Sequence, residues 1–343
     1  MASETLKAYK PESKRYFAMA LDPVHVGTGG FHLGRVDMSI IREPGTNLPK
    51  IPGTSLTGAC RTFAAMQEAG KFPGCAGQGQ REKDAQGKES GVSKGHCGDA
   101  DCPICVTFGF VGSKQSFQGL AHIFDARIVL FPVHSLAGPV WITCPDALSD
   151  WNVQENEPSY DQVRVANGVK RNNGRLNIGW LMLTVEDDFS LDGKLSGIPD
   201  EIKKRAVLVS SDLFSHIVND NLEVRTSVSI DPSTGAASEG ALFTYEALPR
   251  STVLAFEVVF NDPRFYCIGG KRPFNGQECD KSDLKPDQSH DGIQRVRQTV
   301  EKGLTLFEVL GVGGMNTRGM GRLKIGNLED VKSHASAAEG GKK

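Results

Sequence analysis

Four cysteines in a segment with almost no large apolar side chains constrain the fold of this chain more than any other feature. Their spacing is C-x21-C-x4-C-x2-C, and the residues are Cys75, Cys97, Cys102 and Cys105. The surrounding residues 70–107 are rich in Gly, Lys and Gln, so this segment has no core of its own to bury. Four thiolates can close a tetrahedral zinc site that supplies the missing folding free energy. The pattern predicts a zinc-binding insertion at 70–107 with a structural zinc, because four protein ligands leave no open coordination position.

The other cysteines and two histidines leave alternatives open. His96 can replace one cysteine as a ligand, and the four thiols can also stay unliganded. Cys60 and Cys144 lie in apolar contexts and are predicted to be core residues. The pair Cys267 and Cys279 lies in a glycine- and charge-rich loop, where a second metal site with His290 is a weaker hypothesis.

Composition places the chain among globular proteins. With 343 residues, of which 39% are hydrophobic and 23% charged, it can bury one large core or two ordinary ones. It has no run of about eighteen apolar residues, and its N-terminus lacks the basic and apolar regions of a signal peptide, so we expect a cytoplasmic protein without a membrane partner. The formal net charge is −2, so a nucleic-acid site has to be local.

The order of strand and helix patterns predicts an α+β fold with an antiparallel sheet. A strand at 16–26, apolar on both faces, precedes a helix that begins near Thr54 or Ser55, either of which can be its N-cap. Turn-forming residues at 231–235 predict a hairpin. Further strand-like runs lie at 121–131, 140–143, 180–185, 223–230, 241–245 and 252–260.

The C-terminal part combines an amphipathic helix with a glycine-rich loop. Apolar residues recur at three- and four-residue steps over 293–310, with Asp291 as a candidate N-cap and Gly311 as the stop. Five glycines and Arg318 follow within residues 311–321. Glycine lets the backbone approach a ligand closely, and arginine favours a negative ligand such as a phosphate backbone. A flexible turn is the alternative for this loop taken alone.

Other chemical motifs are weak or missing. The basic cluster at 170–175 can be a solvated loop or a loop that touches phosphate, and the solvated loop is favoured. The sequence has no G-x-x-x-x-G-K-[ST] loop, no G-x-S-x-G elbow and no H-E-x-x-H helix. It therefore lacks the signatures of common nucleotide triphosphatases, α/β-hydrolases and zinc proteases.

Several segments together resemble the RAMP superfamily of CRISPR systems, in particular the repeating backbone subunit of type III effector complexes. The resemblance is sharpest at residues 51–61, Ile-Pro-Gly-Thr-Ser-Leu-Thr-Gly-Ala-Cys-Arg, and it covers most of the chain in the right order. The other matching segments are 23–29, 34–43, 124–133, 245–249 and the glycine loop. The cysteine cluster ahead of Phe108 also resembles a zinc-binding insertion found in members of this family.

The resemblance implies an architecture as well as a family. It implies an α+β, modified RNA-recognition (ferredoxin-like) fold with an antiparallel sheet and a zinc-binding insertion. A single domain over 1–326 forms the palm, and a β-hairpin thumb at 222–247 reaches toward a neighbouring subunit. The polar residues 327–343 are predicted to form a disordered tail.

The resemblance further implies how RNA is bound. Guide RNA lies across the palm, gripped by the first helix and the glycine loop, while base pairing supplies the specificity. Backbone N–H groups and basic side chains would contact phosphates without reading sequence. The implied RNA-contacting residues are His25, Lys50, Ser55, Thr57, Arg61, Gly313, Gly314, Asn316, Thr317 and Arg318. Guide RNA, target RNA, copies of this chain and other effector subunits are the implied partners.

Asp37 corresponds to the catalytic aspartate of the family, on the loop after the first strand. Members of this kind cut the paired target RNA with a divalent cation such as magnesium or manganese, and the ribose 2′-hydroxyl is the expected nucleophile. Three alternatives stay open: an endoribonuclease that matures the guide precursor with His25 as acid or base, a non-catalytic RNA-binding scaffold, and a zinc-organised interaction module without RNA. Apart from the resemblance, Asp37 is simply a turn residue that caps local backbone.

Overall fold

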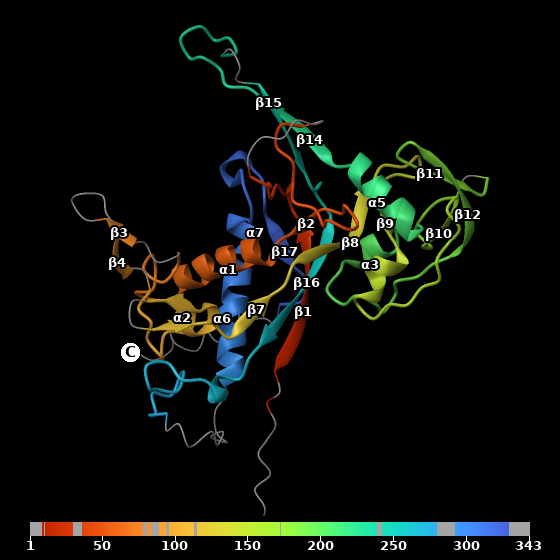
Figure 1. Ribbon diagram of the computed structural model, residues 1–343. Coiled ribbons are helices and arrows are strands. Elements are labelled where there is room, and N and C mark those ends of the chain that lie inside the picture. Colours follow the sequence, from red (N-terminus) through yellow and green to blue (C-terminus); the bar gives the residue numbers. More distant parts are fainter. Residues whose placement is uncertain are drawn as a thin grey trace, which may run out of the picture.

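One large mixed sheet organises the molecule (Figure 1). The computed structural model describes residues 9, 11–29, 36–77, 81–83, 89–93, 96–112, 115–171, 173–238, 242–279 and 292–328. The sheet has eleven strands, nine of them in the order β11-β12-β10-β13-β9-β8-β16-β1-β17, with β2 paired to β8 and β7 paired to β16. These strands are β1 (Glu12–Ala20), β2 (Lys50–Ile51), β7 (Ala121–Ile123), β8 (Ala126–Val133), β9 (Val140–Thr143), β10 (Gln162–Val165), β11 (Arg175–Ile178), β12 (Leu181–Asp188), β13 (Ala206–Leu208), β16 (Val253–Phe260) and β17 (Leu323–Ile325).

The central strands confirm the predicted two-sided burial. β1 pairs antiparallel with β16 on one side and with β17 on the other. Tyr16 packs with Phe256 in one core, whereas Phe17 and Val253 belong to a second core on the opposite face. Alternate side chains of one strand therefore enter two different cores, which is why both faces of β1 are apolar.

Helices on one face of the palm sheet form the first core. They are α1 (Gly53–Gln67), α2 (Pro103–Phe108), α6 (Gly292–Thr305) and α7 (Phe307–Leu310). Val296, Val300 and Leu304 of α6 are buried, as its amphipathic pattern predicts. α6 crosses α1 so closely that a Cβ at Gly303 would lie 2.3 Å from the Cys60 carbonyl oxygen. The predicted single helix over 293–310 is wrong in one respect, because it breaks at Leu306; Asp291 lies outside the described residues.

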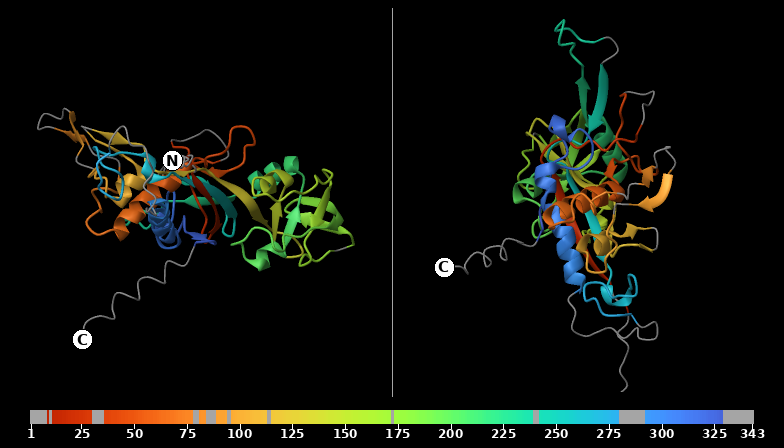
Figure 2. Two further views of the ribbon diagram at one scale, coloured as in Figure 1. Left: turned by 90° about the horizontal axis from the view of Figure 1, so that it is seen from below. Right: turned by 90° about the vertical axis from the view of Figure 1, so that its left-hand side faces the viewer.

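The antiparallel prediction holds for the palm but fails in a lobe at the other end of the sheet, which comprises residues 134–222. Here β9 pairs parallel with β13, and β10 pairs parallel with β12. Parallel pairs need crossover connections, and the long segments between these strands provide them. The lobe also carries α3 (Pro145–Ser149), α4 (Asp200–Lys203) and α5 (Ser211–Asp220). Figure 2 shows the lobe and the α1–α2 side of the palm at opposite ends of the molecule.

The predicted hairpin is present. β14 (Glu223–Ser227) pairs antiparallel with β15 (Phe243–Ala247) in a separate two-stranded sheet. Its far end includes the predicted turn, in which Gly235 N donates to the Asp231 carbonyl. Figures 1 and 2 show this hairpin projecting from the body of the molecule. Residues 239–241 lie outside the described part of the chain.

The remaining elements complete the insertion and the C-terminal end. The short strands are β3 (Arg81–Lys83), β4 (Glu89–Ser93), β5 (Phe110–Val111) and β6 (Ser116–Phe117), and the 3₁₀ turns are η1 (Pro263–Phe265) and η2 (Asn316–Arg318). Asn327 accepts a hydrogen bond from Phe17 N and donates to the Arg15 carbonyl, so the packed structure extends past the predicted boundary of the tail. Residues 329–343 are outside the described residues. Among the helices that the structure describes, none is long and apolar enough to cross a membrane.

Candidate nucleic-acid interface and metal centre

The four predicted cysteines meet at one point. Their sulfur atoms all lie within 4.8 Å of one another, with Cys75 3.6 Å from Cys97 and Cys97 3.7 Å from Cys105. Cys105 is 3.8 Å and Cys102 4.0 Å from Cys75. A tetrahedral site with Zn–S bonds of about 2.3 Å separates its sulfurs by roughly 3.8 Å. The cluster therefore has the size of a four-thiolate metal site.

Local structure brings these ligands together. Cys102 is the residue before α2, Pro103 begins that helix and Cys105 lies in its first turn. Cys75 follows α1, and its N–H donates to the Lys71 carbonyl. Hydrogen bonds from the thiols of Cys105 and Cys97 lower the pKa of Cys102, whereas the contact with Cys102 and burial raise the pKa of Cys105, and burial and the same contacts raise the pKa of Cys97. We call these four cysteines with α2 the cysteine module.

Two alternatives for this region find no support. The His96 ring nitrogen Nε2 forms a hydrogen bond with the Gly77 carbonyl oxygen, and His96 is not among the clustered ligands. Cys267 and Cys279 form a disulfide instead of a second metal site, while His290 lies outside the described residues. Cys60 and Cys144 are buried, as predicted.

Arg61 and Lys71 provide positive charge beside the cysteine module. Arg61 Nε donates to the Cys75 carbonyl at 2.8 Å, and its Nη1 donates to the Gly109 carbonyl at 2.8 Å. Burial lowers the pKa of Arg61, and the four nearby cysteines oppose that shift. Lys71 Nζ lies 3.9 Å from the sulfur of Cys97. A zinc ion with four thiolates carries a net charge of −2, so these two cations balance it.

A second site forms where three distant segments meet the base of the hairpin. We call it the loop junction, and its members are residues 23–27, residues 36–42, residues 312–321 and strand β15. Isolated β-bridges join Val24 to Leu248, His25 to Gly314, Gly27 to Ile40 and Met38 to Tyr245. The glycine loop, the loop after the first strand (residues 23–27) and the Asp37 segment (residues 36–42) thus lie side by side at one end of the palm, where the hairpin begins (Figure 1).

Asp37 is fixed by one residue of the hairpin. Its Oδ2 accepts hydrogen bonds from Thr244 N at 2.7 Å and Thr244 Oγ1 at 2.9 Å. These bonds lower the pKa of Asp37, first through the backbone N–H and then through the hydroxyl, so the group is a carboxylate at neutral pH. Oδ1 makes no hydrogen bond to a described residue. One oxygen is therefore held while the other is available for a ligand.

Asp37 does not belong to a protein metal cluster. In the described part of the chain, the cysteine module is the one group of three or more His, Cys, Asp or Glu side chains that can hold a metal ion. A divalent cation at Asp37 would take its other ligands from water or from a bound phosphodiester. Among the described residues, Asp37 therefore offers a carboxylate at the loop junction without being part of such a group.

His25 lies under the glycine loop and is only 3% exposed. Its Nδ1 lies 2.7 Å from the Glu246 carbonyl oxygen. Because a carbonyl can only accept, Nδ1 carries the proton and donates it. The Gly314 N–H donates to the His25 carbonyl at 2.8 Å. His25 therefore links the glycine loop to the hairpin base.

An ion pair between the half-buried Arg42 and the buried Glu246 holds the Asp37 segment against the hairpin. Glu246 is almost fully buried and accepts from Arg42 Nη1 at 2.7 Å and Arg42 Nη2 at 2.8 Å. The same carboxylate accepts from the Ile40 N–H at 2.9 Å. With this many donors the buried charge is compensated, and the geometry specifies one position for the segment.

The glycine loop packs closely against residues 25 and 26 of the same chain. A Cβ at Gly313 (φ +90°) would lie 2.5 Å from the His25 carbonyl oxygen, so this position requires glycine. Met315 has a left-handed backbone, which costs about 1–2 kcal/mol, and its side chain packs near Tyr245. Arg318 lies over the Phe243 ring at 5.5 Å. The exposed residues of this loop are Gly313, Gly314, Asn316, Thr317, Arg318 and Gly319.

The N-terminus of α1 differs from the prediction. Neither Thr54 nor Ser55 is the N-cap; Pro52 holds that position and makes no side-chain cap. The carboxylate of Asp125 takes the cap's role, because it accepts from Gly53 N at 2.8 Å and Lys50 Nζ at 2.6 Å. The helix terminus predicted for an RNA phosphate thus already holds an anion of the chain itself.

The remaining predicted RNA contacts separate into two groups. Ser55 and Thr57 lie half-buried in the first turns of α1, and the Ser55 N–H donates to the Pro52 carbonyl. Lys50 has its partner in Asp125, and Arg61 faces the cysteine module. His25, Asp37 and residues 313–318 meet at the loop junction.

The sequence did not predict the roles of Thr244 and the Arg42–Glu246 pair, because hydrogen bonds across some two hundred residues leave no local spacing signal.

Comparison with known proteins identifies the family. The family model of the RAMP superfamily matches residues 18–324, and the chain belongs to this superfamily. The chain is 26% identical over 266 residues to the CRISPR system Cmr endoribonuclease Cmr4 of Pyrococcus furiosus, a match that covers 71% of this chain and 80% of that protein.

Solved structures share the fold. A chain in the cryo-EM structure of the type III-B Cmr-beta bound to cognate target RNA matches with a TM-score of 0.58 and 13% identity, over 92% of this chain and 97% of that one. The crystal structure of Cmr4 matches with a TM-score of 0.56 and 18% identity, over 92% and 98% of the two chains. At these identities the structures support the fold alone.

Proposed function

We propose that this chain is a backbone subunit of a type III CRISPR effector complex that binds guide RNA and cleaves the paired target RNA. Its superfamily and its similarity to a Cmr endoribonuclease support this function. The observation that carries the proposal is the loop junction, where Asp37 and the exposed residues of the glycine loop share one surface. Copies of the chain and other effector subunits would be its protein partners.

The proposed RNA contacts follow from exposure and charge. Gly313, Gly314, Asn316 and Thr317 present backbone and polar groups to solvent, and Arg318 adds a guanidinium for phosphate. Ser55 and Thr57 extend the surface toward α1. We give Lys50, Arg61 and His25 structural roles within the RNA-binding face, because each already has a partner in the chain.

The proposed reaction uses Oδ1, the oxygen of Asp37 that Thr244 does not hold. A magnesium or manganese ion would supply Lewis-acid polarisation of the scissile phosphate. Asp37, ionised and anchored on Thr244, holds that ion or orients the ribose 2′-hydroxyl. Attack of the 2′-oxygen on the adjacent phosphorus breaks the P–O5′ bond; the 2′-hydroxyl proton passes to water and the leaving 5′-oxygen takes up a proton from water, which leaves a 2′,3′-cyclic phosphate and a 5′-hydroxyl.

The alternatives differ in what they require of His25 and Asp37. A guide-precursor endoribonuclease needs an accessible acid or base, whereas His25 is buried and its Nδ1 proton is donated to Glu246. A non-catalytic scaffold would use the same RNA surface but would not depend on the Asp37 carboxylate.

Asp37→Asn in the assembled complex distinguishes these functions. Asn keeps the size and the acceptor for Thr244, so we expect guide binding to stay within about twofold and target cleavage to fall on the order of 10²-fold. Asp231→Asn, on the exposed hairpin turn, is the matched control and should cleave normally. Unchanged cleavage by Asp37→Asn contradicts the catalytic role, and loss of precursor processing alone supports the maturation enzyme.

We also propose that the cysteine module binds structural zinc. The sulfur separations and the two flanking cations support a closed four-thiolate site, which has no position for a substrate.

A further inference from the structure

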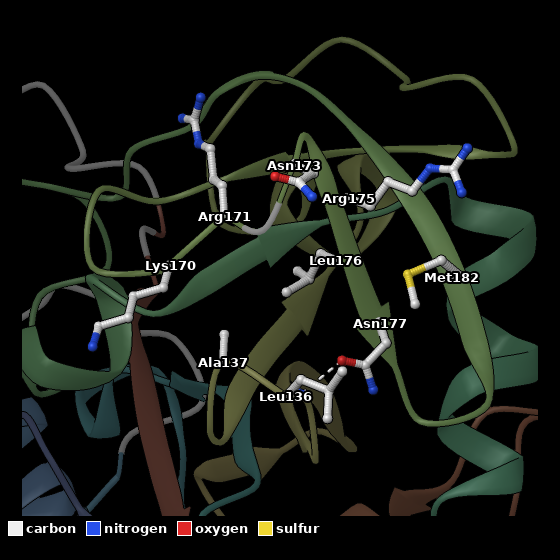
Figure 3. A pocket seen from close by; sticks show the side chains of 9 residues that line it. All are labelled: Leu136, Ala137, Lys170, Arg171, Asn173, Arg175, Leu176, Asn177 and Met182. Carbon is white, nitrogen blue, oxygen red and sulfur yellow. Dashed lines mark hydrogen bonds between the residues drawn. The ribbon is translucent and has the colours of Figure 1, made fainter.

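A hollow on the lobe has the chemistry of a nucleic-acid site but lies away from the loop junction. Its volume is about 550 Å³, and it opens beside the hairpin of β11 and β12 (Figure 3). β11 ends the strand order of the sheet at one side, whereas β17, next to the glycine loop, ends it at the other. The lining residues are Leu136, Ala137, Lys170, Arg171, Asn173, Arg175, Leu176, Asn177 and Met182.

The charge of this hollow has one sign. Three of its lining residues are cationic and none is acidic, although the chain as a whole carries a formal charge of −2. Figure 3 shows Lys170 and Arg171 on one side and Arg175 on the other. Arg171 pairs with Asp188 outside the hollow, while Lys170 and Arg175 make no ion pair with another described residue. Two positive charges are therefore left for an anionic ligand.

An exposed tryptophan lies at the tip of the same hairpin. Trp180 occupies the turn between β11 and β12 and is 95% exposed. The turn is held in place, since Gly179 N donates to the His134 carbonyl at 3.0 Å. Asn177 Oδ1 accepts from Leu136 N at 2.6 Å, which holds Leu136, itself 79% exposed, beside Asn177 in the lining of the hollow. An exposed indole on an anchored turn is a platform on which a base can stack.

We propose that this hollow binds a segment of single-stranded RNA, with its phosphates on Lys170 and Arg175 and a base stacked on Trp180. The combination of unpaired cations with an exposed aromatic ring is the one that sequence-independent binding of single strands uses. The occupant is RNA that is not paired with the guide, because a duplex buries the base faces that Trp180 would contact. The loop junction and the lobe thus provide two separate RNA contacts on one chain.

The test uses the full-length chain and a ten-nucleotide oligouridylate that carries one 4-thiouridine. We expect photocrosslinks to map to Trp180 or its neighbours in the hollow. Trp180→Ala should lower affinity at least about fivefold. Lys170→Glu and Arg175→Glu should each lower the salt dependence of log K by about 0.7, the value for one lost phosphate contact. Lys204→Glu changes an exposed lysine of the same lobe outside the hollow and should change neither quantity.

A variant at the loop junction distinguishes the two proposed RNA contacts. Arg318→Ala should weaken guide binding and leave the crosslink at Trp180 in place, so failure of the lobe site and failure of the proposed function give different results. The proposal is overturned if no crosslink forms in the hollow and Lys170→Glu behaves like Lys204→Glu. It is also overturned if these variants bind RNA normally but release a protein subunit from the assembled complex, which would make the hollow a protein interface.

Discussion

The cysteine module and the loop junction are built in opposite ways. The module takes all four ligands from residues 75–105, and a metal ion can tie this segment to α2, which packs into the first core. The loop junction takes its parts from both ends of the chain and from the hairpin, and hydrogen bonds such as Thr244 to Asp37 hold it. The first region is local and closed, whereas the second is distant in sequence and open to a ligand.

This difference assigns the two regions to different tasks. A tetrahedral site with four protein ligands has no free position, so the module contributes stability. At the loop junction the protein satisfies one oxygen of Asp37 and leaves the other without a partner among the described residues. Perturbing one region should therefore leave the other intact.

The largest expected effect comes from removing a cysteine ligand. Cys102→Ser should lower the zinc content from about one ion per chain toward none, because apparent zinc-binding free energies of about 10–16 kcal/mol depend on the full ligand set. Metal analysis and limited proteolysis measure the loss of zinc and of the module's fold. Cys144→Ser, a buried cysteine at the N-cap of α3, is the control and should keep its zinc. Full zinc content in Cys102→Ser would contradict the four-thiolate site.

The second effect concerns the ion pair that positions the Asp37 segment. Glu246→Gln removes the counter-ion of the half-buried Arg42, so it should cost about 1–3 kcal/mol in the free energy of unfolding. Denaturant titration measures this loss, and zinc content should not change. Glu223→Gln on the same hairpin breaks a partly exposed pair with Arg225 and should cost less than about 1 kcal/mol. Equal losses in the two variants would show that the Arg42–Glu246 pair does not organise the junction.

Sequence patterns predicted the parts of the molecule that depend on local order. The strand at β9, the hairpin, the amphipathic face of α6 and the cysteine cluster follow from periodicity, turn residues and spacing. The N-cap of α1 was predicted wrongly, because Asp125 from a distant turn replaces a local side chain. The parallel pairs of the lobe and the Cys267–Cys279 disulfide were also missed.

The candidate site was predictable only in part, because contacts between residues distant in sequence form it. The resemblance to a family pointed to Asp37, but the residue that anchors it lies some two hundred positions away. The glycines were predicted to approach a ligand, whereas Gly313 is required by the chain's own His25 carbonyl. Pairing across the fold, which spacing does not encode, decides these contacts.

The smallest expected effect is a shift in pH dependence. Thr244→Val removes the hydroxyl that helps lower the pKa of Asp37 but keeps the backbone N–H. The pKa of Asp37 should therefore rise toward its usual value, moving the acidic limb of target cleavage to higher pH and leaving the rate at pH 7 unchanged. The stabilisation from this carboxylate is present above its unfolded pKa and is lost as pH falls through the lowered folded value. Thr244→Ser keeps a hydroxyl and should leave the profile in place; an unshifted profile in the valine variant would contradict the anchoring role.

The most direct test of the account is to map where guide RNA touches this chain in the assembled complex. Ultraviolet crosslinking followed by peptide mass spectrometry identifies the contacted residues. We predict crosslinks within residues 313–318 and at the base of the hairpin near Tyr245, with none in the cysteine module. Crosslinks confined to residues 96–108, with the loop junction unlabelled, would contradict the assignment of the two regions.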